Sequence, residues 1–178
     1  MSDAPDRQLL DRLVREHMAD LLRLAVRLTG NLDTAEDVLQ DALAAIARAW
    51  NGFRQTATFR TWATRIVVNA FRDHLRRTDR KTLLRTVSLE ADPTDPRPHE
   101  PGSSTEHVEL NEHIARHVSA LPARQREVLV LIVYEELPVT EVAAMLEMTT
   151  ANVHATLYAA RQRLARELAE YLGVRPEA

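Results

Sequence analysis

The sequence contains no cysteine, and only four of its 178 residues are glycine. The absence of cysteine excludes disulfide bonds and thiolate metal sites. Few glycines, short β-branched runs and no hairpin turn between alternating apolar residues argue against a β-sheet. No apolar run approaches the roughly 20 residues that span a bilayer. The polar start, Met1 to Gln8, does not resemble a signal peptide. We therefore expect a soluble, cytoplasmic protein without membrane insertion.

The residues that are abundant favour helices. Ala, Leu, Arg and Glu recur throughout, and these side chains lose little rotamer freedom in a helix. The length allows one ordinary domain or two small helical ones. The net charge of −3 argues weakly against a nucleic-acid partner. However, basic residues cluster over 60–85 and acidic residues over 33–41 and 90–112, which indicates two kinds of partner surface.

The first half of the chain is predicted to form three helices. Apolar residues at three- and four-residue steps predict a helix over 7–29, which Gly30-Asn31 ends. Asn31 or Asp33 can cap a second helix that ends at Asn51-Gly52. A third helix is predicted over 59–78. Its buried side is predicted to comprise Trp62, Ile66, Val67, Ala70, Phe71 and Leu75.

A linker rich in proline and acidic residues follows. Four prolines between residues 90 and 104 exclude a helix and predict an extended, flexible segment. We therefore predict an all-α protein with two small helical domains, 1–85 and 105–178, joined by a linker at 86–104. The second domain is predicted to contain a helix with Leu110, Ile114, Val118 and Leu121, followed by helices over 122–134, 139–146 and 150–171.

The last two predicted helices are separated by only three residues, Glu147-Met148-Thr149. Two helices joined by such a short turn are typical of a helix-turn-helix, whose second helix reads base edges in the major groove. Arg161 and Arg163 lie further along and suit phosphate contacts. The alternative is a helical hairpin that packs but reads no DNA. The residues predicted to face DNA at the start of the second helix are Thr150, Ala151, Asn152, His154, Ala155 and Tyr158.

The third helix has a basic and polar side, and the loop before it contains two phenylalanines. An asparagine amide can contact a base, and a carboxylate can orient a neighbouring arginine. Aromatic rings and polar atoms suit an unstacked base. The alternative is a charged, solvated surface. The helix residues are Arg65, Asn69, Arg72, Asp73, Arg76 and Arg77, and the loop residues are Phe53, Arg54, Gln55, Phe59 and Arg60.

The second helix carries an acidic face, which is either a solvated surface or a docking surface for a basic partner. It comprises Asp33, Glu36, Asp37, Gln40 and Asp41. His113 and His117, with His107 before them, have a spacing that can chelate a metal, but no third ligand is evident. No nucleophile–base pair, carboxylate pair or phosphate-binding glycine loop is present. We therefore predict no catalytic residues, no cofactor and no metal.

Taken in order, these segments resemble the extracytoplasmic-function sigma factors of the sigma-70 family. The segments that resemble sigma region 2 are Arg27-Leu-Thr-Gly-Asn, Ala35-Glu-Asp-Val-Leu-Gln-Asp, Ala49-Trp, Phe59-Arg-Thr-Trp-Ala, Arg65-Ile-Val-Val-Asn and Asp73-His-Leu-Arg-Arg. The segments that resemble sigma region 4 are Leu121-Pro-Ala-Arg-Gln-Arg-Glu-Val-Leu, Thr140-Glu-Val-Ala-Ala-Met-Leu and the pattern Val153, Leu157, Ala160-Arg161, Arg163-Leu164.

The resemblance implies a region 2 bundle of three or four helices and a four-helix region 4 domain. It implies binding of core RNA polymerase, through the β′ clamp helices and the β flap, and of promoter DNA, with an anti-sigma factor as regulator. The acidic helix would bind the clamp helices. The third helix and its loop would take the −10 element and an unpaired base, and the Asn152 helix would read the −35 element.

The recognition helix departs from the family pattern. The family usually has a sequence close to Gly-Thr-Val-Lys-Ser-Arg-Leu, whereas this chain has Ala151-Asn-Val-His-Ala-Thr-Leu, followed by Ala159 where arginine is frequent. Fewer phosphate contacts imply weaker, less salt-sensitive binding by this domain alone. Glu147 replaces the usual glycine of the turn, at a cost on the order of 1 kcal/mol if that position needs a positive φ.

Two other function classes give different expectations. A free-standing helix-turn-helix repressor or activator would bind duplex DNA alone, usually as a dimer on a palindrome, and would leave the first domain and its acidic face without a role. An enzyme would need a pocket with perturbed titratable groups, for which the sequence offers no candidate. The sequence therefore favours an alternative sigma factor that acts without catalysis of its own.

Overall fold

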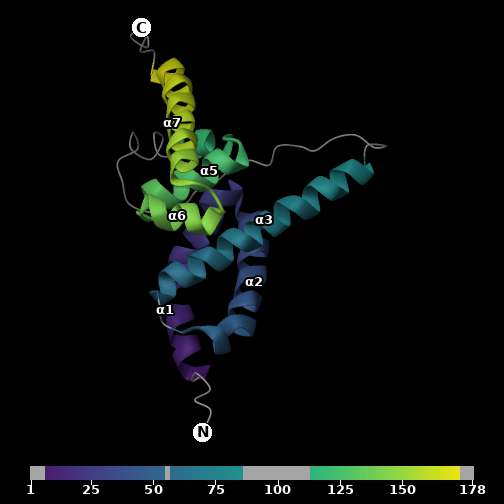
Figure 1. Ribbon diagram of the computed structural model, residues 1–178. Coiled ribbons are helices and arrows are strands. Elements are labelled where there is room, and N and C mark those ends of the chain that lie inside the picture. Colours follow the sequence, from purple (N-terminus) through teal and green to yellow (C-terminus); the bar gives the residue numbers. More distant parts are fainter. Residues whose placement is uncertain (1–6, 55–56, 86–112, 173–178) are drawn as a thin grey trace. The chain divides into compact units, whose positions relative to one another are not determined.

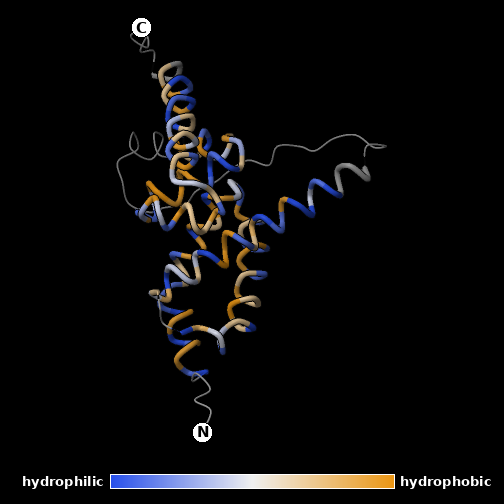
Figure 2. Tube along the Cα trace, viewed as in Figure 1, coloured by the Kyte–Doolittle hydropathy of each residue, from blue (hydrophilic) through white to orange (hydrophobic). Residues whose placement is uncertain are grey.

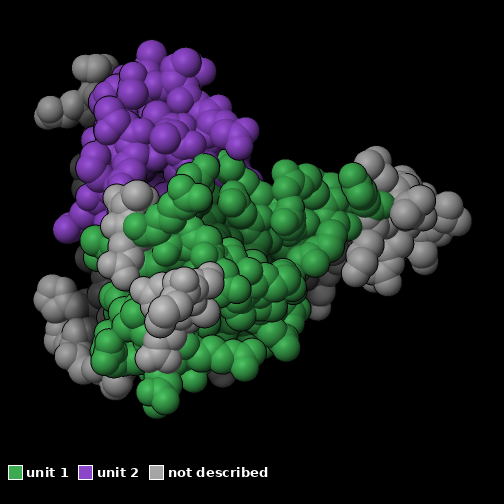
Figure 3. Space-filling view, turned by 60° about the horizontal axis from the view of Figure 1, so that its bottom comes forward, with its two compact units in different colours: residues 1–95 green, residues 96–178 purple. Residues whose placement is uncertain are grey.

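The computed structural model describes residues 7–54, 57–85 and 113–172, with side chains described over 7–54, 57–80 and 113–169. Every regular element within these ranges is a helix, which confirms the predicted all-α fold (Figure 1). The chain divides into two compact units, residues 1–95 and 96–178 (Figure 3). The predicted linker, residues 86–104, lies outside the described residues, and the domain limits stay a prediction.

Unit 1 is built from three long helices, α1 (Arg7–Thr29), α2 (Leu32–Ala49) and α3 (Phe59–Arg85), with a short 3₁₀ turn, η1 (Trp50–Gly52), after α2. Each of the three long helices contacts the other two. Polar and apolar residues alternate around them (Figure 2), so that each contributes an apolar stripe to a common core. The observed bounds of α1 are those predicted from its periodicity.

The helix ends in unit 1 follow ordinary capping chemistry. Gly30 has φ 76°, which suits a residue without a Cβ, and its N–H donates to the Val26 carbonyl over 2.7 Å. Of the two predicted caps of α2, Asn31 is the one used, because its side-chain oxygen accepts from the Thr34 N–H over 2.9 Å. The Thr58 hydroxyl accepts from the Thr61 N–H over 3.2 Å and begins α3 in the same way.

Helix α3 differs from its prediction in length and in the face it buries. It continues to Arg85 rather than ending at Thr78, because residues 79–85 contain no glycine or proline and are mostly good helix formers. Val67 and Phe71 are fully buried as predicted, whereas Trp62, Ile66, Ala70 and Leu75 are only half-buried. The buried face of α3 is therefore rotated relative to the predicted one, and it includes smaller side chains that pack closely against α1 and α2. The buried side chains of α3 are Phe59, Ala63, Thr64, Val67, Val68 and Phe71.

An aromatic cluster joins the end of α2 to the start of α3. The ring of Phe59 lies 5.8 Å from Trp62, 6.4 Å from Trp50 and 5.5 Å from His17, measured between centroids. Phe53 stacks at 5.4 Å from Trp50 and lies 4.7 Å from Trp62. Phe59 is only 7% exposed, whereas Phe53 is half-buried. Phe59 therefore belongs to the core, and its ring is not open to a stacked base as the sequence suggested.

Unit 2 is a compact arrangement of short helices around one long helix. It comprises helical residues 113–119, α5 (Ala123–Leu129), the π-helical turn η2 (Val130–Tyr134), α6 (Val139–Leu146) and α7 (Thr150–Leu172). Helix α7 contacts both α5 and α6. The beginning of the predicted preceding helix, including Leu110, lies outside the described residues. The fully buried side chains here include Val128, Val130, Leu131 and Leu146.

The predicted helix over 122–134 is two elements rather than one. Pro122 precedes the first α-helical residue, and α5 changes at Val130 into a π-helical turn. The Glu135 N–H donates to the Val130 carbonyl over 3.1 Å, which is the i to i+5 bond of that geometry. The wider turn ends the helix ahead of Pro138, whose missing N–H is harmless at the start of α6.

The turn between α6 and α7 contains a left-handed residue. Glu147 has φ 54° and ψ 46°, its N–H donates to the Ala143 carbonyl, and the Met148 N–H donates to the same oxygen over 2.9 Å. The turn therefore requires the positive φ that glycine adopts without strain. On the other side, the Thr149 hydroxyl accepts from the Asn152 N–H over 3.2 Å and caps α7.

Replacing Phe59 by alanine should destabilise unit 1 far more than replacing Phe53. We expect F59A to lower the free energy of unfolding by about 3–5 kcal/mol, because it empties a closed site in the core. F53A should cost about 1 kcal/mol, because this ring is already half in water. Urea denaturation followed by tryptophan fluorescence measures this directly, since both tryptophans, Trp50 and Trp62, lie in the cluster. Equal losses in the two variants would contradict this packing.

Replacing Glu147 by glycine should stabilise unit 2. Relief of the left-handed strain, less the extra entropy of the unfolded glycine, should leave a gain on the order of 0.5–1 kcal/mol. E147A is the matched control, because it removes the carboxylate but keeps the Cβ. Urea denaturation followed by far-UV circular dichroism should show the gain in E147G alone. A similar gain in E147A would assign the effect to charge instead of backbone conformation.

Candidate nucleic-acid interface

One side of α3 is polar and basic over about three helical turns. Arg65, Asn69, Asp73 and Arg76 are exposed and repeat at three- and four-residue steps, so they share a face. The guanidinium of Arg76 bonds to the Asp73 carboxylate, which is the orienting role that the sequence predicted for Asp73. Arg72 is half-buried beside them. This face offers cations for phosphates and one exposed amide for a base edge.

Helix α2 shows the opposite charge on its exposed side. Its buried residues fall between the acidic ones, so the predicted face is indeed turned to solvent. The cluster lies in the first half of the helix, where the dipole favours negative charge. The exposed residues are Asp33, Glu36, Asp37, Gln40 and Asp41.

An ion pair connects the acidic face to the basic face. The Arg77 guanidinium on α3 donates to the Asp41 carboxylate on α2 over 2.5 Å. This hydrogen bond and the charge of Asp41, followed by the charges of Asp73 and Asp37, raise the pKa of Arg77 above its ordinary value. The sequence assigned these two residues to different partners, and it gave no sign of the pairing because they are 36 residues apart.

The loop before α3 presents less aromatic surface than predicted. Because the Phe59 ring is buried, Phe53 is left as the half-exposed ring, flanked by the exposed Arg54 and Arg60. The predicted site residue Gln55 lies outside the described residues. The loop still brings a ring and two cations to the start of the basic face of α3.

The first three turns of α7 expose a nearly uncharged surface. Val153, Leu157 and Ala160 are buried, and Val142, Ala143 and Leu146 of α6 are buried with them, as expected for a helix-turn-helix. Tyr158 is 67% exposed. The exposed residues predicted to face DNA are Thr150, Ala151, Asn152, His154, Ala155, Tyr158 and Arg161. Arg163 is half-buried, and its Nε donates to Glu167 over 2.9 Å.

Two arginines of α5 each reach the C-terminal end of another helix. The buried Arg126 guanidinium donates to the carbonyl of Ser119, and burial lowers the pKa of Arg126. The Arg124 Nη1 donates to Glu127 Oε2 over 3.1 Å and lies 3.5 Å from the carbonyl oxygen of Leu146, the last residue of α6. The sequence did not single out either arginine, because the carbonyls they reach are set by tertiary packing.

Of the predicted histidines, His117 contacts α7. The His113 and His117 rings lie 5.8 Å apart, and His117 Nδ1 is 3.3 Å from Glu167 Oε2. His107 lies outside the described residues. Among the residues that the structure describes, no group of three or more His, Cys, Asp or Glu side chains has the geometry to hold a metal ion.

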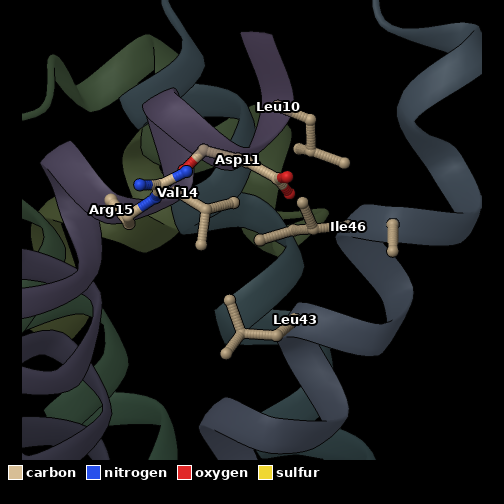
Figure 4. Close-up of a pocket in the computed structure, with 7 residues that line it drawn as sticks. Leu10, Asp11, Val14, Arg15, Leu43 and Ile46 are labelled. Carbon is tan, nitrogen blue, oxygen red and sulfur yellow. Dashed lines mark hydrogen bonds between the residues drawn. The ribbon is translucent and has the colours of Figure 1, made fainter. Parts of the chain in front are cut away.

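A shallow groove of about 430 Å³ lies between α1 and α2 (Figure 4). Leu10, Val14, Leu43 and Ile46 line it, and Asp11 and Arg15 also border it. The Arg15 Nε donates to the backbone carbonyl of Asp11 over 3.1 Å. These aliphatic walls offer no nucleophile with an adjacent base. Over the described ranges, no helix combines the length and apolarity needed to cross a membrane.

Comparisons with known proteins find a match for each of the two units. The family model of sigma-70 region 2 matches residues 13–81, and that of sigma-70 region 4 matches residues 113–164. The chain is 34% identical to the ECF RNA polymerase sigma factor SigM of Mycobacterium tuberculosis, over 93% of this chain and 80% of that protein. It is 30% identical to the RNA polymerase sigma-E factor of Streptomyces coelicolor, over 89% of this chain and 85% of that protein.

A solved structure shares the fold. The sigma factor RpoE of Bartonella quintana, solved in complex with the anti-sigma factor NepR, matches with a TM-score of 0.75 and 21% identity. The match covers 89% of this chain and 96% of that one. The family acts by binding rather than by catalysis. The chain therefore belongs to the extracytoplasmic-function group of the sigma-70 family, and it is an alternative sigma factor that binds core RNA polymerase and directs transcription initiation.

Proposed function

We propose that the three surfaces of this sigma factor serve three different contacts. The acidic face of α2 docks on core polymerase, the basic face of α3 with its preceding loop takes the −10 element, and the first turns of α7 read the −35 element. The observation that carries this assignment is the sorting of charge within unit 1. Helix α2 exposes carboxylates, whereas α3 exposes arginines around a single amide.

The acidic face suits a basic protein partner such as the β′ clamp helices. Glu36, Asp37 and Gln40 follow each other at steps of one and three residues and are all exposed. Complementary charge accelerates docking and disfavours wrong partners, including DNA. The same negative charge makes this face unsuitable for phosphates, so the DNA contacts of unit 1 must lie elsewhere.

The basic face of α3 suits single-stranded promoter DNA. Arg65, Arg76 and the cations of the loop would hold phosphates, and Asn69 would bond to a base edge. The half-exposed ring of Phe53 would stack on an unpaired base. Holding such a base outside the duplex would favour the melted state of the promoter.

The exposed start of α7 would lie in the major groove at the −35 element. Asn152 can pair with adenine through two hydrogen bonds, and the methyl groups of Ala151 and Ala155 can lie against thymine. We further propose contact with the β flap, a cytoplasmic location and no catalysis of its own. We also propose regulation by an anti-sigma factor, because a sigma factor of the same fold was solved with such a partner.

Reversing charge on α2 should weaken polymerase binding. The double variant E36K/D37K should lower affinity for core enzyme more than tenfold, because attraction to a basic surface becomes repulsion. The double variant D11K/E16K is the matched control, since it makes the same change in net charge at two exposed positions of α1. Co-elution or fluorescence anisotropy with purified core enzyme measures the affinities. If the α2 variant and the α1 control both bind core enzyme with the affinity of the unchanged protein, the docking face lies elsewhere.

Removing the amide of Asn69 should affect DNA and leave polymerase binding intact. N69A should reduce open-complex formation roughly tenfold on a cognate promoter, the size expected for one or two lost hydrogen bonds. The defect should shrink on a template that is already unpaired at the base that Asn69 reads. In vitro transcription with saturating core enzyme separates this loss from a docking defect. An N69A protein with full activity would argue against the −10 assignment.

A further inference from the structure

The first turns of the recognition helix α7 contain little positive charge. From Thr150 to Ala160, α7 contains no lysine or arginine, so Arg161 is its first permanently charged cation. Arg163 is tied to Glu167. Proteins that bind a major groove usually draw much of their affinity from cations on the flanking phosphates. For a −35 reader of this kind, part of that charge has to come from outside the first turns of α7.

Arg124 is a cation held beside the helix-turn-helix. Its Nη1 lies 3.5 Å from the carbonyl oxygen of Leu146, which places the guanidinium at the end of α6, next to the turn that leads into α7. Its side chain is 52% exposed. The guanidinium therefore reaches the surface at the side of the recognition helix where its first turn begins.

A buried carboxylate fixes the direction of this guanidinium. Glu127 Oε2 accepts from the Arg124 Nη1 over 3.1 Å, and the Glu127 side chain is only 3% exposed. A buried carboxylate is strongly oriented, because losing its hydrogen-bonding partners would be costly. A guanidinium has five N–H donors, so bonds through one nitrogen leave others for a phosphate. Arg126, two residues along, is buried and cannot take this role.

We propose that Arg124 is a DNA-backbone contact next to the −35 reading helix, and that Glu127 positions it. This inference rests on the proposed reading of the −35 element by α7. The ligand is a phosphate of the DNA strand that passes the turn between α6 and α7. The contact carries no base specificity, and it supplies the charge that the first turns of α7 lack.

The test is the salt dependence of promoter binding by the holoenzyme. Arg124→Gln removes the charge but keeps an amide that can donate near the end of α6, and we expect it to weaken binding three- to tenfold. The slope of log affinity against log salt should fall by about 0.9, the value for one phosphate contact. The loss should be uniform across −35 sequences. Arg124→Lys should restore the slope, and Glu127→Gln should lower affinity with the slope unchanged, because the charge stays but is no longer oriented.

Arg116→Ala is the matched control, because it removes an exposed arginine from the helical residues 113–119 of the same unit. It should change the slope far less than Arg124→Gln does. Weaker binding in Arg124→Gln with an unchanged slope would overturn the proposal and assign Arg124 to holding α6 alone. If, in the same assay, the unchanged protein binds a promoter with a scrambled −35 element as tightly as the cognate promoter, the proposed function of α7 is overturned as well. If binding by the unchanged protein depends on the −35 element but Arg124→Gln leaves the slope of log affinity against log salt unchanged, only the inference about Arg124 is overturned.

Discussion

Close packing of helices through alanine is the constraint on which both units depend. Ala25, Ala35, Ala42 and Ala63 are completely buried in unit 1, one or two on each long helix. Since the distance between helix axes follows the side chains at the contact, small residues bring the backbones close together. On the surface of this bundle, Arg77 of α3 meets Asp41 of α2. Ala143 and Ala160 are buried in the same way in the helix-turn-helix of unit 2.

The elements that could be predicted from sequence are those with strong periodicity and clear ends. Helix α1 runs between its predicted bounds, and α6 and α7 are separated by the predicted three residues, because apolar spacing and caps are local properties. Glu147 adopts the positive φ that its place in the turn suggested. The family could also be predicted, because two sets of motifs occur in the right order along one chain.

The features that could not be predicted depend on tertiary contacts. The α3 stripe includes Ala63 and Val68 instead of the larger Ile66 and Leu75, because neighbouring helices select shape as well as hydrophobicity. Phe59 was expected at the DNA surface, yet the nearby indole rings enclose it. The change from α- to π-helix at Val130 and the approach of Arg124 to the Leu146 carbonyl, 22 residues along the chain, leave no mark in a residue pattern.

The ion pair between Asp41 and Arg77 has an evolutionary consequence. It joins a residue proposed to serve the polymerase to one proposed to serve DNA, so substitution at either position removes the charge with which the other is paired. Effects of two such substitutions are not additive, because the second acts on a pair that the first has already broken. Positions 41 and 77 should therefore change together when the family diverges. A single-site scan would assign either residue to both partners, although each is proposed to contact only one.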